Sequence, residues 1–177
     1  MKLTSKEILV TNSDWIIFQY TFINNLKNKT TLKIYFAGPL FSVAEQNFNN
    51  TLVNKLELLG YDVFLPQRDG AELNKIPFVD MTVAQRNKTI FAIDREQVLK
   101  CDIFLFVLDG RVPDEGACFE LGIAYTQKYL TNSCKQIIGL QTVVRASFLD
   151  SKLIAMIEVP FDEIFSSEKE LFEFLSV

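Results

Sequence analysis

The sequence predicts an α/β fold in which a doubly wound, mainly parallel five-stranded sheet is flanked by helices. Segments of strand character alternate with segments of helical character along most of the chain. Two runs, residues 32–37 (LKIYFA) and 103–108 (IFLFVL), are almost wholly apolar, as is typical of strands covered on both faces. The length of 177 residues favours one such domain with a terminal extension.

Residues 1–30 form the predicted extension, and residues 31–177 form the predicted domain. The extension is rich in apolar and aromatic side chains before a polar close at NNLKNKTT. A disordered tail would be more polar. We therefore expect a helix or a strand pair that packs on the main body or on a partner subunit.

The first half of the domain has clear boundary signals. Gly38-Pro39 ends the strand at 32–37, and Ser42 can cap a helix that runs to Leu59. Gly60 stops that helix, and residues 61–65 (YDVFL) follow as the next strand. Pro66 ends this strand and begins a polar loop over residues 66–77.

The second half continues the alternation and then weakens. We expect a helix over residues 80–100, the strand at 103–108, a helix that Gly116 lets begin and that reaches Leu130, and a strand at 136–141. Beyond Gln141 the pattern predicts a helical segment at 152–157, a short strand around Ile157–Val159 and a closing helix over 168–175.

Composition narrows the classes of function. The 18 basic and 22 acidic residues give a net charge of −4, and the basic residues are scattered, which argues against a nucleic-acid partner. No apolar run is long enough to span a membrane, and the N-terminus lacks the pattern of a signal peptide. Three widely spaced cysteines suit a reducing compartment. These observations predict a cytoplasmic protein.

The available chemistry rests mainly on carboxylates, hydroxyls, amides and cations. Because the chain has no histidine, catalytic triads and pairs that depend on imidazole are excluded. No glycine-rich phosphate loop is present, so we expect no cofactor. The acidic residues could bind a metal, but they lack the spacing of a cation-binding loop, and we expect no metal.

One carboxylate stands out in the segment 109–125 (DGRVPDEGACFELGIAY). Glu120 lies one turn inside a predicted helix that is otherwise mostly apolar. Keeping an ionised carboxylate there costs free energy unless partners or a solvated cleft compensate, so a functional site is one explanation. A solvent-facing stripe on the helix is the other.

The loops that follow three strands should meet at one edge of the sheet. Parallel strands share a C-terminal edge, where open α/β sheets bind ligands. This places the loops at 38–39, 67–69 and 109–116 near Glu120 and predicts an acidic pocket for a neutral or weakly basic ligand. Neighbouring carboxylates separate each other's pKa values, which allows one to attack as an anion while another donates a proton, as in glycosyl transfer.

Each of these polar residues also has a structural explanation. Asp94 and Asp102 can cap or solvate helix and strand ends. Asp109 and Asp114 can be turn residues, and Gln67 can be a surface amide. The residue types alone leave both readings open.

Four motifs together are far more specific. They are IYFAGPLF at 34–41, PQRDG at 66–70, Asp94 eight residues before Asp102 in DREQVLKCDIFLFVLDG, and DEGACFELGIA at 114–124. This ordered set resembles the nucleoside 2-deoxyribosyltransferase family, over residues 33 to about 160. The resemblance implies a Rossmann-like (flavodoxin-like) domain that exchanges the base of 2′-deoxynucleosides by a retaining double displacement.

The resemblance also implies roles for individual residues. Glu120 would attack C1′, Asp94 would handle the base and its proton, Asp114 would hold the sugar hydroxyls, and Tyr35 would lie near the nucleophile. The residues expected to contact the substrate are Gly38, Pro39, Phe41, Gln67, Asp69 and Gly116.

Members of this family are homo-oligomers whose sites borrow residues from a neighbouring subunit. The borrowed segment often begins with a polar residue that reaches the 5′ end of the sugar, whereas this chain has Ile154 in IAMI. Ile154 cannot form that hydrogen bond, and an altered substrate or an engineered position would each explain it. The C-terminus, FLSV, also lacks the terminal aromatic residue of some members.

Two alternatives accompany base exchange between a small-molecule nucleoside and a nucleobase. The first is an N-glycosidase in which water takes the second step on a 2′-deoxynucleoside or its 5′-monophosphate. The second is a non-catalytic module that senses nucleosides or nucleotides. Incubation of thymidine with adenine separates transfer from hydrolysis, because only transfer yields deoxyadenosine.

Overall fold

The computed structural model describes residues 31–71, 76–142 and 153–176. Residues from Leu32 onward form one unit, which contains all the helices and strands considered below. The expectations for residues 1–30, for Lys152 at the start of the predicted helical segment, and for anything in 143–151 lie outside the described residues.

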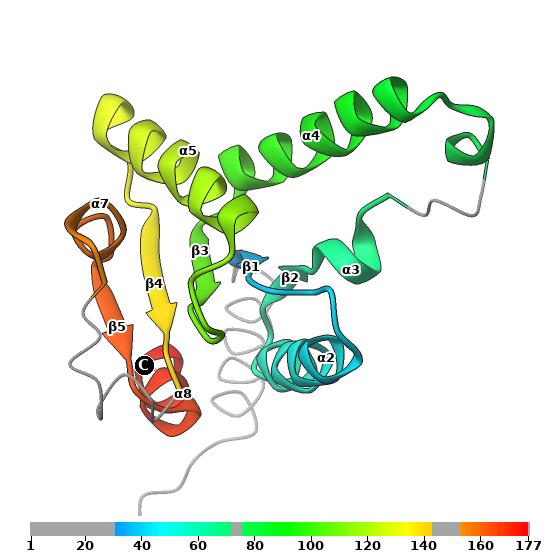
Figure 1. Cartoon of the computed structure of the whole chain (residues 1–177). Helices are drawn as coiled ribbons and strands as arrows, with labels where there is room; N and C mark the ends of the chain where they lie inside the picture. The colour runs from blue at the N-terminus through cyan, green and yellow to red at the C-terminus, as the bar shows by residue number, and fades with distance from the viewer. Residues whose placement is uncertain (1–30, 72–75, 143–152, 177) are drawn as a thin grey trace, which may run out of the picture. The chain divides into compact units, whose positions relative to one another are not determined.

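The sheet has five strands, all parallel, and confirms the predicted fold class (Figure 1). In chain order the strands are β1 (Lys33–Ala37), β2 (Asp62–Phe64), β3 (Ile103–Val107), β4 (Gln136–Leu140) and β5 (Glu163–Phe165). Their spatial order is β2-β1-β3-β4-β5. The chain winds outward in both directions from β1 and β3, so the loops after these two central strands diverge at a topological switch point.

Helices cover both faces of the sheet (Figure 1). On one face, α2 (Val43–Leu58) and α8 (Glu168–Leu175) pack on Ile34, Leu105 and Ile138. On the other, α4 (Val83–Lys100), α5 (Glu115–Thr131) and the short α7 (Ala155–Glu158) pack on Tyr35, Phe104 and Ile137, or at the edge of that cluster. Alternate residues of each strand therefore face different helices, as the period of a β-strand requires.

Local sequence sets the start of each long helix. Ser42 and Glu45 form a reciprocal capping box at α2, and Thr82 and Gln85 form another at α4. At α5 the cap is Asp114, whose side chain accepts a hydrogen bond from the amide of Ala117. The helix therefore begins at Glu115, one residue before the predicted start, and Gly116 lies inside its first turn.

Two predicted elements are corrected. Residues 66–77 do not form a simple loop, because Pro66–Asp69 is a short helix, α3; a 3-10 turn, η1, follows at Phe78–Asp80. The predicted strand around Ile157–Val159 is wrong, since Ile157 lies in α7 and Val159 caps it. The last strand is β5, which pairs with β4.

A row of stacked aromatic rings crosses three neighbouring strands on the α4 and α5 side. Phe64 and Phe104 are the register partners of Tyr35 in β2 and β3. Their ring centroids lie 5.7 and 5.8 Å from that of Tyr35, and the rings are nearly parallel. Tyr35 is therefore held firmly from both sides, and its hydroxyl is aimed toward the helices above it.

Candidate active site

Tyr35 and Glu120 are joined by a hydrogen bond. The Tyr35 hydroxyl donates to Oε1 of Glu120 over 2.8 Å, linking the central strand β1 to the second turn of α5. Oε2 of Glu120 has no hydrogen-bond partner in the part of the chain that the structure describes. One carboxylate oxygen is thus fixed by the sheet, and the other is available to a ligand.

Glu120 lines a cavity of about 360 Å³ between α4 and α5. Asp94 lines the same cavity from α4, so the structure brings together two of the predicted acidic residues. Gly116 is a third predicted residue on the wall. The remaining lining residues are Asn87, Ile90, Phe91, Arg95, Phe119 and Ile123.

The two carboxyl groups retain protons more readily than ordinary carboxyls. The pKa of Glu120 is raised to about 7, chiefly by burial and to a smaller extent by the charges of Asp94 and Asp114, while the hydrogen bond from Tyr35 opposes the rise. Burial raises the pKa of Asp94 to about 6. Burial, together with the charges of Glu120 and Asp94, raises the pKa of Tyr35, so its hydroxyl stays a donor.

These values leave about one proton shared between two carboxyl groups near neutral pH. A reaction that needs one carboxylate anion and one carboxylic acid would find both forms in this cavity between pH 6 and 7. The proton lies on Glu120 more often than on Asp94, so the form with an ionised Glu120 and a protonated Asp94 is the minor one of the two. The pair is therefore suited to nucleophilic attack combined with general acid–base catalysis.

Asp114 is the N-cap of α5, and one of its two carboxylate oxygens is hydrogen-bonded within the fold. Its Oδ1 accepts a hydrogen bond from the Ala117 amide over 2.9 Å, so the structural explanation, a helix cap, holds for that oxygen. A Cβ on Gly116 would lie 3.2 Å from the same Oδ1, closer than most such contacts. A larger residue at position 116 would press on the Asp114 carboxylate, whereas glycine lets the carboxylate keep its position.

Gln67 and Asp69 do not line the cavity. The side-chain amide of Gln67 donates to the carbonyl of Gln46 and to Asn50, and its oxygen accepts from Asn49, all in α2. Asp69 accepts from the Leu65 amide and from Arg68. Both side chains hold α3 in place, because their hydrogen-bonding groups are used within the fold.

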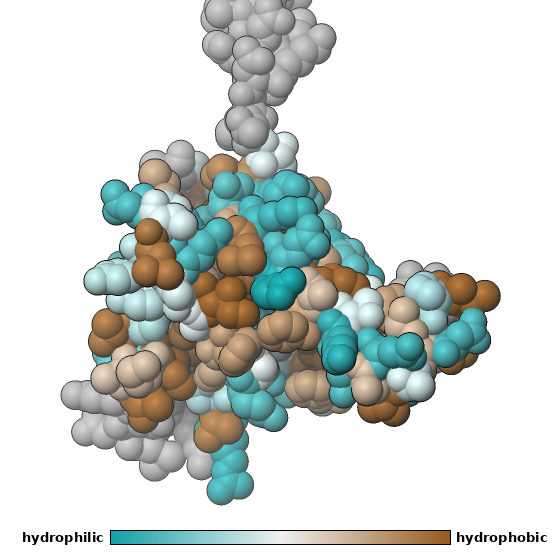
Figure 2. Space-filling view, turned by 90° about the horizontal axis from the view of Figure 1, so that it is seen from above, coloured by the Kyte–Doolittle hydropathy of each residue, from teal (hydrophilic) through white to brown (hydrophobic). Residues whose placement is uncertain are grey.

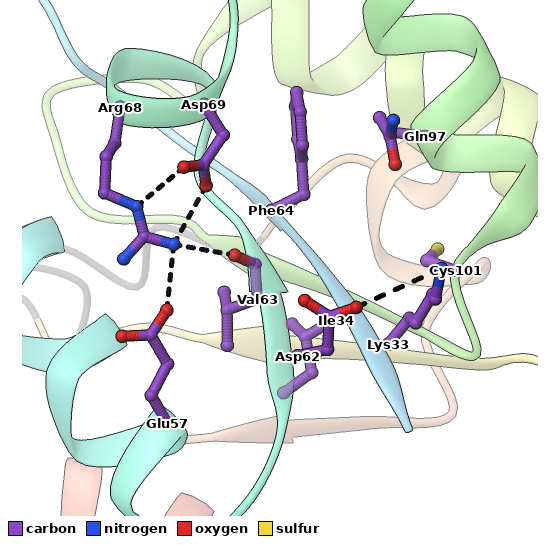
Figure 3. A pocket seen from close by; sticks show the side chains of 10 residues that line it. All are labelled: Lys33, Ile34, Glu57, Asp62, Val63, Phe64, Arg68, Asp69, Gln97 and Cys101. Carbon is purple, nitrogen blue, oxygen red and sulfur yellow. Dashed lines mark hydrogen bonds and ion pairs between the residues drawn. The ribbon is translucent and has the colours of Figure 1, made fainter. Parts of the chain in front are cut away.

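A second cavity, of about 200 Å³, lies beside β2 and contains Asp69 (Figure 3). Arg68 there contacts Glu57, Asp69 and the carbonyl of Val63. Because β2 is an edge strand, its outer carbonyl would otherwise lack a strand partner, and Arg68 supplies the donor. The charged side chains of this cavity form ion pairs with each other, which indicates that they stabilise the edge of the sheet.

Asp102 and Asp109 also serve the fold. Asp102 accepts from the backbone amide of Lys33, and Asp109 accepts from the amide and hydroxyl of Thr142. The structural explanation therefore accounts for both residues. They tie the ends of neighbouring strands together.

The remaining predicted substrate contacts lie outside the cavity wall. Gly38 has a φ of 155° and would place a Cβ 3.1 Å from that of Val107, so it allows close approach of β1 and β3. The carbonyl of Pro39 accepts from Asn49. Phe41 is 81% exposed, and Ile154, which caps α7, is 66% exposed.

Sequence reasoning missed the aromatic and cationic part of the cavity. Phe91 and Phe119 face each other with ring centroids 6.0 Å apart, and Arg95 lies 5.7 Å above the Phe91 ring. The available signal was the spacing of Asn87, Phe91 and Arg95, each four residues apart and hence on one helical face. That signal does not reveal what the face meets.

No group of side chains that could hold a metal ion occurs among the described residues. Within the same ranges, every helix is too short or too polar to cross a lipid bilayer.

Comparisons with known proteins agree with the fold and the motifs. A conserved protein from Enterococcus faecalis V583 is 30% identical, with a TM-score of 0.61 over 81% of this chain and 96% of that protein. A 2-deoxyribosyltransferase from Bacillus psychrosaccharolyticus is 22% identical, with a TM-score of 0.62 over 78% of this chain and 89% of that one, and supports the fold. No curated protein matches the chain.

A CMP N-glycosidase from Clostridium botulinum is a more distant likeness. It is 19% identical, with a TM-score of 0.45 over 81% of this chain and 96% of that enzyme, which is too weak to support an inference. The family described as nucleoside 2-deoxyribosyltransferase matches residues 34–152, about two thirds of the chain. The chain therefore belongs to the nucleoside 2-deoxyribosyltransferase family.

Proposed function

We propose that this protein transfers the 2-deoxyribosyl group of a 2′-deoxynucleoside from one nucleobase to another. The observation that carries the proposal is the pairing of Glu120 with Asp94 in one cavity, with Tyr35 bonded to Glu120. Family membership supports the same class of reaction. In the proposed reaction a second nucleobase accepts the 2-deoxyribosyl group, and Glu120, Asp94 and Asp114 take the roles given below.

In the first step Glu120 is the nucleophile. Its free oxygen attacks C1′ and forms a C–O ester bond while the C1′–N bond to the base breaks. The electron pair of that bond leaves with the base nitrogen, which takes the proton carried by Asp94. Tyr35 keeps its hydrogen bond to Oε1, so that the attacking oxygen faces the cavity.

In the second step an incoming base reverses this sequence. Its ring nitrogen forms a new bond to C1′, the ester bond breaks, and the electron pair returns to Glu120. The proton of that nitrogen passes to Asp94. Because C1′ is inverted twice, the product keeps the configuration of the substrate.

Asp114 would contact the sugar through its second carboxylate oxygen. Its first oxygen is held by the Ala117 amide, which orients the carboxylate at the start of α5. Asp114 also lies close enough to raise the pKa of Glu120. A sugar hydroxyl that donates to Asp114 would therefore be positioned beside the nucleophile.

The direct test is base exchange. Thymidine is incubated with adenine or hypoxanthine, and the products are separated by chromatography. New deoxyadenosine or deoxyinosine supports transfer, whereas free deoxyribose without a new nucleoside favours the N-glycosidase alternative. Binding without consumption favours the sensing module.

Glu120→Gln and Glu115→Gln form a matched pair for the nucleophile. Both lie in α5, but Glu115 is exposed and does not line the cavity. Glu120→Gln should abolish turnover, and Glu115→Gln should retain it. Mass spectrometry with a slowly reacting 2-fluoro nucleoside should find a glycosyl adduct on Glu120. Full turnover by Glu120→Gln would contradict the assignment.

We also propose that the protein acts as a homo-oligomer. Figure 2 views the molecule from above, and apolar side chains lie in groups among polar ones on the surface it shows. Ile154 and Met156 at α7, and Tyr129 and Leu130 at the end of α5, are largely exposed. Light scattering tests the assembly, and Met156→Asp should shift it toward the monomer if α7 lies at a subunit interface.

A further inference from the structure

The cavity that contains Glu120 has an inner and an outer part. Ile90 and Asp94, four residues apart on α4, are half-buried and lie with Glu120 on the inner side. Asn87, Phe91 and Arg95 occupy the neighbouring face of α4 and are exposed. A substrate whose reacting carbon meets Glu120 therefore has part of its structure beside this outer face.

The outer part offers flat apolar surface. Phe119 is 61% exposed, and Phe91 is 47% exposed, although both line the cavity. Arg95 covers one side of the Phe91 ring. Aromatic rings are surfaces on which nucleobases stack, whatever their hydrogen-bonding pattern. The sugar has no such planar surface, so the base is the part of a nucleoside that suits this location.

Arg95 is free to bind a ligand group. Within the described ranges it makes no ion pair or hydrogen bond, in contrast to Arg68, which is bound by Glu57 and Asp69. The contact with Phe91 restrains its guanidinium at the cavity. A guanidinium only donates hydrogen bonds, and its two parallel N–H groups match two neighbouring acceptors.

We propose that Arg95 makes this site selective for 6-oxopurines, through paired hydrogen bonds to O6 and N7 of the base. This inference rests on the proposed function, because it takes the occupant of the cavity to be a nucleobase. Hypoxanthine and guanine present two acceptors side by side at O6 and N7, which an arginine binds in a bidentate manner. Adenine presents an amino donor in place of O6, and that donor faces the donors of Arg95.

Hypoxanthine and adenine form the matched ligand pair, because they differ chiefly in the group at position 6. Binding of each free base is measured by isothermal titration calorimetry, with no deoxynucleoside present and hence no turnover. The wild-type protein should bind hypoxanthine at least about tenfold more tightly than adenine, the discrimination that one bidentate pair provides.

Three substitutions in α4 test the source of this preference. Arg95→Gln should abolish or reverse the preference for hypoxanthine, because the glutamine amide can accept from the amino group of adenine while it donates to N7. Arg95→Lys keeps the charge without the fork and should keep only part of the preference. Arg86→Gln, in the same helix but outside the cavity wall, should leave the ratio unchanged. Circular dichroism confirms that each variant is folded.

The outcomes separate this inference from the proposed function. An Arg95→Gln protein with the wild-type ratio overturns the role of Arg95, and so does a wild-type protein that binds hypoxanthine no better than adenine or not at all. Selective binding without base exchange supports the selectivity of Arg95 and contradicts the transferase proposal instead. Base exchange that uses both bases equally supports the transferase proposal and contradicts the selectivity of Arg95.

Discussion

At the scale of single residues, the burial of Glu120 reduces the stability of the fold but increases the reactivity of its carboxylate. Its carboxyl is largely buried beside Asp94 and Asp114, so ionisation is unfavourable in the folded protein. The hydrogen bond from Tyr35 recovers part of this cost. A nucleophile that is poorly solvated and held by one oxygen is reactive, and the same features reduce the stability of the fold.

Replacing Glu120 with Gln should therefore stabilise the protein at high pH. A carboxyl whose folded pKa is raised contributes stability below its unfolded pKa, and this contribution is lost as the pH rises through about 7. Because Gln does not ionise, Glu120→Gln should exceed wild type by about 1–3 kcal/mol at pH 8. Near pH 4.5 the difference should vanish or reverse.

Urea denaturation at the two pH values measures this difference. Glu115→Gln, on the exposed side of α5, is the control and should show no comparable gain at pH 8. A Glu120→Gln protein that is no more stable than wild type at pH 8 would mean that the carboxylate is well solvated.

Replacing Tyr35 with Phe should change the pH dependence of activity. In the wild-type protein the hydrogen bond from the Tyr35 hydroxyl lowers the pKa of Glu120. Removing the hydroxyl should therefore raise this pKa and move the acidic limb of kcat/KM to higher pH. We expect a loss of about tenfold or more at pH 6, since a hydrogen bond to a charged group contributes about 1.5–3 kcal/mol. The loss should be smaller at pH 9.

Tyr61→Phe is the matched control for this experiment. The Tyr61 hydroxyl donates to the carbonyl of Leu175 over 2.8 Å and takes no part in the cavity. Its loss should affect stability and leave the pH profile in place. An unshifted profile for Tyr35→Phe would show that Glu120 does not titrate in the observed limb.

At the scale of elements, α4 carries Asp94 and Arg95 and is fastened at its C-terminal end. Lys135, the residue before β4, is only 5% exposed, and its ammonium donates to the carbonyls of Val98 and Cys101 over 2.6 and 2.5 Å. These carbonyls belong to the last turn and the cap of α4, where a cation also meets the negative end of the helix dipole.

Lys135→Met should therefore destabilise the fold by about 1–3 kcal/mol, the cost of leaving buried carbonyls without a donor. Urea denaturation at pH 7 measures the loss. Lys100→Met is the control at the same end of α4, because Lys100 is exposed and its ammonium pairs, among the described residues, only with Glu96. Its effect should stay below about 0.5 kcal/mol. Equal effects of the two substitutions would show that the buried contacts of Lys135 contribute nothing.

Elements with strong local signals were predictable, and elements that depend on distant partners were not. The wholly apolar β3 and the Ser42 cap of α2 follow from burial and capping, which are written in adjacent residues. The short β5 has three residues and is defined by its pairing with β4. Ile157 has high strand propensity but lies in α7, where packing overrides that preference.

The candidate site divides in the same way. Asp94, Glu120 and Tyr35 were predictable because their motifs are specific, and the structure brings these three together. Gln67 matched a motif too, yet its amide is bonded to α2. Whether a polar side chain meets a ligand or its own fold depends on neighbours that a loop sequence does not identify. Arg95 was missed for the same reason.

At the scale of the whole molecule, the two faces of the sheet have different tasks. The face under α2 and α8 is filled by aliphatic residues such as Leu56, Leu105 and Leu171, and the two acids and the tyrosine of the site lie outside that cluster. The face under α4 and α5 carries Tyr35 in its aromatic row, with Phe104 stacked on it. Packing on the second face therefore positions a functional group as well as stabilising the fold.

Truncations on the two faces should separate stability from activity. Leu56→Ala, at a fully buried site on the α2 face, should cost about 2–5 kcal/mol, and its folded fraction should keep wild-type kcat/KM and pH profile. Phe104→Leu should cost less stability, about 1–2 kcal/mol, because Leu fills much of the same volume. It should nevertheless lower kcat/KM severalfold and move the acidic limb upward, since the Tyr35 ring loses a stacking partner. Urea denaturation combined with pH–rate profiles tests both variants, and equal losses of activity per unit of lost stability would show that the two faces serve the site alike.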